Sequence, residues 1–175
     1  MFGSRQERIS LLARANQGRH KCPSVRQNLI QLLGAADGVQ FLDLSLSDRL
    51  RRNFHDAFQQ AVQRFRPSWH STYSAEEQPV AIQVTAEIAM SHDRDIHLFL
   101  THYSEMCGAL CLGTNALAAK AEELLRFDRD SIAIASPDGQ NGLLLDWIPD
   151  DPMVTFLVVW GVEWVSVAEG TTVGK

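Results

Sequence analysis

The sequence has no run of apolar residues that approaches the roughly 20 a helix needs to cross a bilayer. Its first residues, Met1 to Glu7, lack the apolar core of a signal peptide. These two absences predict a cytoplasmic protein that does not enter membranes. No internal repeat or low-complexity tract is visible, which favours one globular domain, with or without an extension.

Cysteine is scarce, with Cys22, Cys107 and Cys111 only. An odd number without the spacing of a disulfide framework predicts free thiols in a reducing compartment. These three residues and His20 could supply four zinc ligands. The residues between Cys107 and Cys111 are Gly-Ala-Leu, however, which indicate a strand rather than the turn of a zinc knuckle. We therefore expect buried, inert cysteines.

The common catalytic and nucleotide-binding motifs are also missing. The sequence contains no Gly-x-Ser-x-Gly elbow, no Gly-x-x-x-x-Gly-Lys-Ser/Thr loop and no Gly-x-Gly-x-x-Gly motif. The adjacent carboxylates Asp150 and Asp151 lie between Pro149 and Pro152, which favours a turn and a helix cap over an acid–base pair. We expect no catalytic residues and no cofactor.

Lysine is rare, so nearly all the positive charge is carried by arginine, and it is unevenly distributed. Residues 1–70 hold 11 Lys and Arg against 5 Asp and Glu, a net +6, whereas residues 71–175 hold 5 against 16, a net −11. Such asymmetry favours docking of the basic part on the acidic part of the same or a sister chain. No DNA-binding motif accompanies the arginines of residues 49–66, so we expect no nucleic-acid partner.

Helical periodicity dominates the first 67 residues. It predicts helices at about 4–16 and 24–33, separated by a break at His20–Pro23, and a third helix at about 45–66. The third helix carries one apolar stripe, and its aromatic residues favour packing on a sheet. The stripe consists of Leu50, Phe54, Phe58, Ala61, Val62 and Phe65. A short extended piece is expected at 39–42, and the polar stretch Ser68–Pro79 is expected to be a linker.

From Val80 onward the pattern alternates between apolar and polar residues, which is typical of strands. We predict strands at 80–88, 95–102 and 108–113, a helix from Thr114, and a hairpin whose strands flank the turn at 136–142. Residues 152–168 fit a strand or a helix, and their β-branched residues favour the strand. The predicted fold class is α+β, with a helical N-terminal part followed by an antiparallel β-sheet flanked by helices. The predicted domains are a helical extension at 1–44 and an α+β domain at 45–175, which could form one continuous domain.

The predicted order of elements over residues 45–170 resembles the fold of type III secretion chaperones. The best local match is Ser131–Asp151, where a strand, a glycine-containing turn and a leucine-rich strand are followed by Pro-Asp-Asp. The resemblance implies a non-catalytic cytosolic homodimer that holds an unfolded segment of a partner on strand edges and apolar patches. The chain departs from the family in its extra N-terminal helices and in the strand favoured at 152–168.

Three tryptophans, Trp147, Trp160 and Trp164, are candidate anchors for a partner, because tryptophan is enriched in binding hot spots. Their apolar surroundings fit a place in the core equally well. We predict a non-enzymatic, secretion-chaperone-like module that binds another protein, an effector or a toxin. One alternative is an immunity-type inhibitor, whose acidic surface would bind the basic site of a folded toxin.

A metal-assisted hydrolase is the second alternative. The densest group of possible ligands is His92, Asp95, His97 and His102, and these residues would hold a divalent cation if one were bound. On the predicted strand, however, His97 and His102 point to opposite faces because they are five positions apart, and side chains alternate between faces from one position to the next. We therefore expect no metal site.

Overall fold

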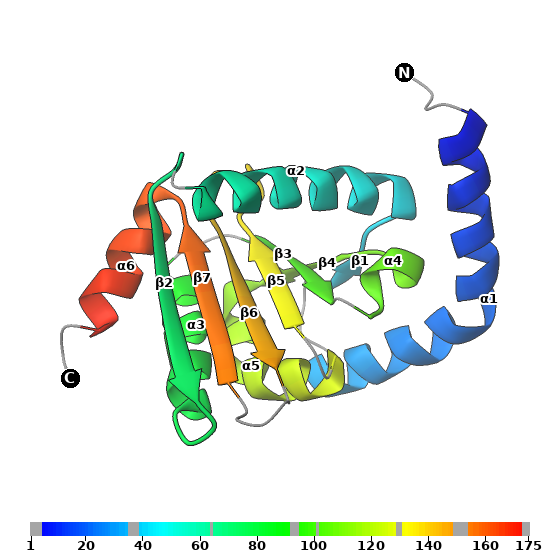
Figure 1. Ribbon diagram of the computed structural model, residues 1–175. Helices are drawn as coiled ribbons and strands as arrows, with labels where there is room; N and C mark the ends of the chain where they lie inside the picture. The colour runs from blue at the N-terminus through cyan, green and yellow to red at the C-terminus, as the bar shows by residue number, and fades with distance from the viewer. Residues whose placement is uncertain are drawn as a thin grey trace.

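The computed structural model describes residues 5–34, 39–63, 65–91, 95–100, 102–128, 131–148 and 154–172 (Figure 1). Their order confirms the α+β class and the helical N-terminal part. The elements follow one another as α1 (Arg5–Leu33), β1 (Gln40–Phe41), α2 (Leu44–Val62), β2 (Ser68–Ser74), α3 (Gln78–Met90), β3 (Asp95–Leu100), α4 (Ser104–Cys107), β4 (Leu110–Gly113), α5 (Thr114–Asp128), β5 (Ser131–Ala135), β6 (Gly142–Ile148), β7 (Val154–Trp160) and α6 (Val162–Thr172). No described helix is both long and apolar enough to cross a bilayer.

An antiparallel sheet organises these elements. Its seven strands lie in the order β1-β4-β3-β5-β6-β7-β2, and each neighbouring pair is antiparallel. The predicted hairpin is confirmed, with Ala135 opposite Gly142 and Ser131 opposite Asp146. The predicted strands at 95–102 and 108–113 correspond to β3 and β4, and the extended piece at 39–42 contains β1.

Helices cover the two faces of the sheet unequally. The back face is packed by α3, α5, α6 and the last turns of α1, which share one core with the inward residues of β3 to β7. On the front face α2 crosses the upper halves of the strands, and in Figure 1 no other described helix lies over that face. The lower half of the front face therefore has no helical layer among the described residues.

The packing of α2 on the sheet confirms the prediction made from its apolar stripe. Phe54 lies between Phe99 and Trp160, with ring centroids 5.6 Å and 4.8 Å away. Ala57 and Ala61 complete the contact with the Trp160 indole. The N-terminus of α2 is capped by Asp43, whose Oδ1 accepts a hydrogen bond of 2.9 Å from the Leu46 amide.

The two helices predicted for residues 4–33 are one. Pro23 lies inside α1 rather than in a break, and α1 bends along its course in Figure 1. Tertiary contacts hold the segments on both sides of Pro23. Leu29 and Leu33 are buried in the main core, and Gly18 lets α1 approach α4 so closely that a Cβ there would lie 2.7 Å from the Met106 carbonyl oxygen.

Two predictions in the middle of the chain are wrong. Ser68–Ser74, expected within a linker, is strand β2, which pairs with β7 along its whole length. Residues 80–88, expected as a strand, belong to helix α3. Both periodicities are present there, but the buried positions are Ala81, Val84, Thr85, Ile88 and Ala89, which is helical spacing.

The C-terminal segment combines both alternatives. The favoured strand is confirmed at Val154–Trp160, and a helix follows from Val162. Gly161, with φ of 92°, makes the turn between them, and its amide donates to the Pro67 carbonyl at 3.3 Å. A single continuous strand over 152–168 was therefore wrong in its second half.

The expectation of free cysteines is wrong for two of the three. Cys22 of α1 and Cys107 of α4 form a disulfide with a Cα–Cα distance of 5.2 Å, across 85 residues of sequence. Sequence spacing could not predict this pair, because the fold brings it together. A disulfide is typical of oxidising compartments, so the cysteines no longer argue for a reducing one.

Candidate protein-binding site

The lower front face of the sheet presents apolar side chains that no helix among the described residues covers. Strand register places Asp146, Phe156 and Thr72 in one cross-strand row. The next row holds Ile148, Val154 and Ser74. We call these six residues the open face. Phe156 is 37% exposed and Ile148 and Val154 are half-buried, so the open face offers an apolar surface to a partner.

Strand β2 contributes Thr72 and Ser74 to the open face and is the outermost strand on that side of the sheet. The Gly161 amide, directly after β7, donates a hydrogen bond to the carbonyl of Pro67, directly before β2. The Pro67 carbonyl therefore points toward the β7 side of β2. In an antiparallel pair, the backbone groups of every second residue point toward the neighbouring strand. The backbone N–H and C=O groups of Trp69, Ser71 and Tyr73 therefore also point toward β7. The backbone N–H and C=O groups of Ser68, His70 and Thr72 therefore point away from the sheet.

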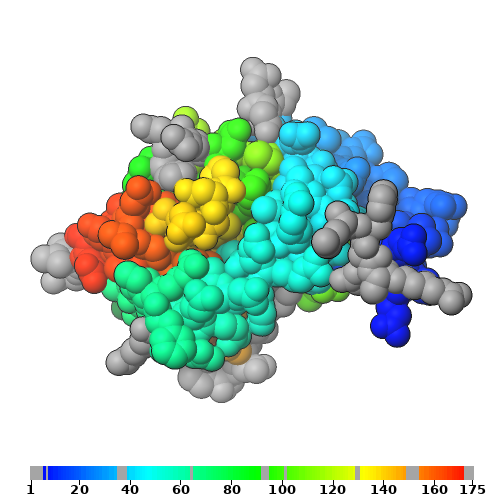
Figure 2. Space-filling model, turned by 90° about the horizontal axis from the view of Figure 1, so that it is seen from above, coloured from blue at the N-terminus to red at the C-terminus, as the bar shows by residue number. Residues whose placement is uncertain are grey.

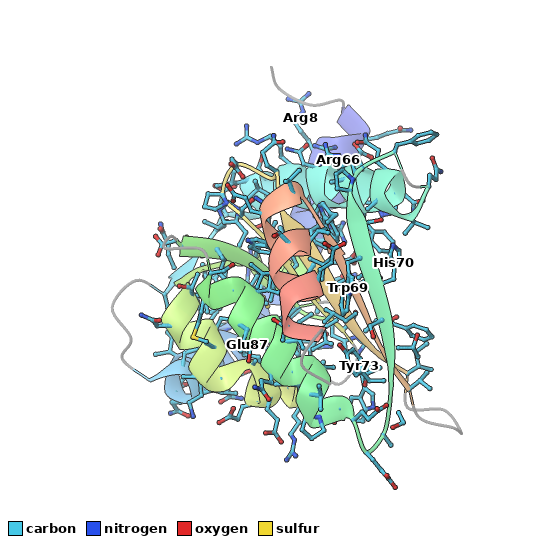
Figure 3. The ribbon with its side chains drawn as sticks, turned by 90° about the vertical axis from the view of Figure 1, so that its left-hand side faces the viewer. Arg8, Arg66, Trp69, His70, Tyr73 and Glu87 are labelled. Atoms are coloured by element: carbon cyan, nitrogen blue, oxygen red, sulfur yellow. A yellow bond between two sulfur atoms is a disulfide. The ribbon has the colours of Figure 1, made fainter. Side chains whose placement is uncertain are left out.

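This edge lacks the features that usually prevent strand addition. Over its seven residues β2 has no proline, no lysine and no bulge, and its register with β7 is continuous from Ser68–Trp160 to Ser74–Val154. Figure 3 looks onto β2, with His70 partway along the strand and α6 beside it. An extended chain could add here through backbone hydrogen bonds.

Exposed apolar side chains continue at the upper end of this edge. Val62, the last residue of α2, is 47% exposed, and Phe65, just before β2, is 78% exposed. These residues lie on the apolar stripe predicted for the third helix, but α2 ends at Val62 and Phe65 lies beyond it. The exposed end of this stripe extends the apolar surface around the start of β2.

A small pocket lies between α2, β3 and the β5–β6 turn, with a volume of about 50 Å³. Figure 2 shows the turn, in yellow, directly beside α2, in cyan. His97 lines this pocket, and burial lowers the pKa of its imidazole although Asp95 opposes the effect. The ring is therefore neutral at pH 7.

Ser136 also lines the pocket, and its hydroxyl makes hydrogen bonds within the β5–β6 turn. Its hydroxyl donates to Asp138 Oδ1 at 2.6 Å and accepts from the Asn141 amide at 3.0 Å. Asp138 Oδ1 accepts a second bond from the Gln140 amide. These contacts close the hairpin, and no hydrogen bond joins Ser136 to the His97 ring within the described residues. The pocket therefore lacks an assembled nucleophile–base pair.

The three candidate tryptophans have different positions. Trp160 and Trp164 are 1% and 0% exposed, against α2 and in the main core respectively. Trp147 is half-buried and packs against the main core. Trp160 also restricts Gly142, where a Cβ would lie 2.4 Å from the indole. The partner-binding role stays a prediction, but in this conformation Trp160 and Trp164 do not reach the surface.

The candidate metal ligands are not brought together in the described part of the chain. His92 lies outside the described residues, while Asp95 and His97 share the front face of β3. The exposed His102 follows β3, and its backbone amide binds Asp128 Oδ1 at 3.1 Å. Among the residues described, no group of three or more His, Cys, Asp or Glu side chains could hold a metal ion.

Cys111 is the remaining thiol. It pairs with His97 across β3 and β4 and is half-buried. Burial and then the nearby Asp95 charge raise the pKa of this thiol, so it stays protonated at neutral pH and is a poor nucleophile. The zinc set weighed from sequence is also divided, because Cys22 and Cys107 are bonded to each other.

Sequence reasoning missed β2, which is the main component of this surface. The signal available was the run Trp-His-Ser-Thr-Tyr, which contains residues that favour strands and lacks proline and glycine. Comparison with known proteins found no matching family model, no matching curated protein and no matching solved structure. The site must therefore be interpreted from its own geometry.

Proposed function

We propose that this protein is a non-enzymatic protein-binding module that holds an extended segment of another protein along β2, in the manner of a secretion chaperone. The observation that carries the proposal is the edge of β2 from Ser68 to Thr72, which has no neighbouring strand on its outer side among the described residues and lies beside the open face. Strand addition uses backbone groups for affinity and alternate side chains for specificity. The outward groups of Ser68, His70 and Thr72 meet the first requirement.

The open face defines the chemistry of the segment. Thr72 and Ser74 are small, and they separate the apolar Phe156 and Val154 from the free edge. A large apolar side chain on the added strand can extend over them to this surface. Since side chains alternate between faces, the segment should carry apolar residues at every second position.

The test uses a displayed library of random linear peptides and two variants at one position. Thr72→Pro removes an outward N–H without removing a bond to β7, whereas Thr72→Val keeps the N–H. We expect the wild-type protein and Thr72→Val to enrich peptides with alternating apolar residues, and Thr72→Pro to lose them. Circular dichroism checks that both variants are folded. Equal enrichment by Thr72→Pro, or none by the wild type, would refute the proposal.

The immunity-type inhibitor remains the alternative, supported by the net charge of −11 in residues 71–175. It predicts a folded partner with a basic surface and an association rate that falls steeply with salt. Binding of this kind would not respond to Thr72→Pro. The pair of variants therefore separates the two functions.

A further inference from the structure

The free edge of β2 has charges of opposite sign near its two ends. Arg66 lies two residues before the strand and Glu76 two residues after it. The Arg66 side chain bonds Gln60 through Nε at 2.8 Å, and its terminal nitrogens make no hydrogen bond to a described residue. Glu76 is exposed. Figure 3 shows Arg66 at the upper end of the strand, with Tyr73 far below it.

Between Arg66 and Glu76 the edge contains no Asp, Glu, Lys or Arg, and it includes the exposed His70. An edge with a positive start and a negative end is complementary to itself when two copies run antiparallel. With Ser71 of both copies on a two-fold axis, His70 lies opposite Thr72, and Ser68 opposite Ser74. Beyond the paired strands, this arrangement brings the bend that holds Arg66 of each copy beside the turn at residues 75–77 of the other copy, which carries Glu76.

This register also pairs the outward backbone groups of His70 and Thr72, while the amide and carbonyl of Ser74 already bond to Glu77 within each copy. The outward groups belong to Ser68, His70 and Thr72, so His70 and Thr72 of opposite copies form hydrogen-bonded pairs on both sides of the axis. The two seven-stranded sheets would then join into one. Phe65, 78% exposed and in the same bend as Arg66, would lie near the turn at residues 75–77 of the second copy and lose part of its exposure to water.

We infer that a second copy of this chain occupies the β2 edge when no partner segment is bound. Self-pairing covers a sheet edge that would otherwise promote aggregation. The dimer is isologous, because the same strand serves both copies. Binding of a partner segment would require the copies to separate, and this competition rests on the proposed function because both associations use the same backbone groups.

Charge reversal tests the register. Arg66→Glu and Glu76→Arg each replace two opposite-charge contacts with two like-charge contacts, and the double variant restores both. We expect each single variant to raise the dimer dissociation constant about tenfold or more, and the double variant to return within about threefold of the wild type. Arg8→Glu is the matched control, because Arg8 is an exposed arginine in the first turns of α1, an element without strand pairing to β2.

Sedimentation velocity over a range of concentrations gives the constants, with 19.5 kDa as the mass of one chain. A wild-type protein that stays monomeric, or single variants that dimerise like the wild type, would overturn the inference. The same holds if the double variant fails to recover while remaining folded.

Peptide binding by the monomeric Arg66→Glu variant is measured separately with the peptides enriched by the wild type. Binding at least as tight as that of the wild type supports the competition, since the edge is no longer occupied. Weaker binding overturns the competition and leaves the dimer intact as an inference. A dimer with the predicted charge dependence and no peptide binding by any variant would remove the proposed function alone.

Discussion

Arg14 makes a bidentate electrostatic contact that joins α1 to α2. Its guanidinium binds both carboxylate oxygens of Asp48 on α2, with Nη1 2.7 Å from Oδ1, and both side chains are about four-fifths buried, at 20% and 22% exposure. The hydrogen bond from Arg14 holds the pKa of Asp48 below its ordinary value, against the opposing effect of burial. Charge-assisted, bidentate pairs of this kind are among the stronger polar contacts.

We predict that Asp48→Asn lowers the free energy of unfolding by about 1–2 kcal/mol at pH 7. Because the folded-state pKa of Asp48 is lowered, its stabilisation is complete above the ordinary carboxyl pKa of about 4 and is lost as the pH falls through the folded-state value. Urea unfolding of both proteins at several pH values measures the difference.

The difference between wild type and Asp48→Asn should therefore shrink toward zero in acid. Asp56→Asn, an exposed carboxylate on the same helix, is the matched control and should change stability by less than about 0.5 kcal/mol. A difference at pH 7 that persists unchanged in acid would show that the Arg14–Asp48 pair is not its source.

The charge pattern anticipated such contacts only in part. Arg51 pairs with Glu105, and Arg26 Nη2 donates to the Cys107 carbonyl at 2.7 Å, so basic residues of the first half do dock on the second. The main partner of Arg14, however, is Asp48 of the same half. Net charge predicts attraction between segments, but individual pairs depend on which side chains the fold brings within reach.

At the scale of elements, α1 is attached to the protein by a covalent bond as well as by packing. The Cys22–Cys107 disulfide joins it to α4, and Leu29 and Leu33 lie in the main core. Residues beyond that packing are more weakly held, since Ile9 and Leu12 are 57% and 63% exposed. The disulfide closes a long loop, which restricts the unfolded chain more than a short loop would.

We predict that Cys22→Ser lowers the free energy of unfolding by about 2–5 kcal/mol, the usual loss for a native disulfide. Thermal unfolding with and without a reductant measures it, and the reductant should lower the Tm of the wild type but not of Cys22→Ser. Cys111→Ser, which removes the thiol outside the disulfide, should retain the reductant effect. A wild-type Tm that does not respond to complete reduction would contradict the prediction.

Helix α3 illustrates why element type was harder to predict than element position. Its sequence alternates strictly enough to suggest a strand, yet Ala81, Val84 and Ile88 form a buried helical stripe against the sheet. Pro79 at the first turn was the local signal for a helix start. When a segment carries both a helical and a strand pattern, the elements that pack against it decide which structure forms.

At the scale of the whole molecule, the helices cover the two faces of the sheet unequally, and this determines where apolar side chains remain exposed. Phe156 and Leu157 are neighbours on β7 with opposite environments, because successive side chains point to opposite faces. Phe156 lies on the open face, 37% exposed, whereas Leu157 is 0% exposed in the main core. Substitutions at these two positions therefore distinguish an effect on partner binding from an effect on the free energy of unfolding.

We predict that Phe156→Thr costs about 1 kcal/mol of stability, because much of the ring already meets water. Leu157→Ala should cost about 2–5 kcal/mol, since it leaves a cavity in the core. Affinity for the peptides enriched by the wild type should fall about tenfold in Phe156→Thr, a value typical of one lost apolar anchor. Urea unfolding and fluorescence anisotropy measure the two effects, and unchanged peptide affinity would exclude the open face from the site.

Local patterns in the sequence were sufficient for the α+β class, the amphipathic α2, the β5–β6 hairpin and helix α5. Each of these depends on neighbouring residues, through periodicity, capping and the turn from Ser136 to Asn141. The binding surface did not follow from such patterns. It depends on the position of β2 at the edge of the sheet and on the position of α2, which covers only the upper half of the front face.

The pairing of Cys22 with Cys107 and the burial of Trp160 depend in the same way on contacts between distant segments. A strand at the edge and a strand in the centre can have similar sequences, because their difference lies in what is beside them. Which backbone groups stay free, and which apolar side chains stay exposed, is therefore a property of the assembled layers. Propensity and spacing describe only the chain within a few residues of each position.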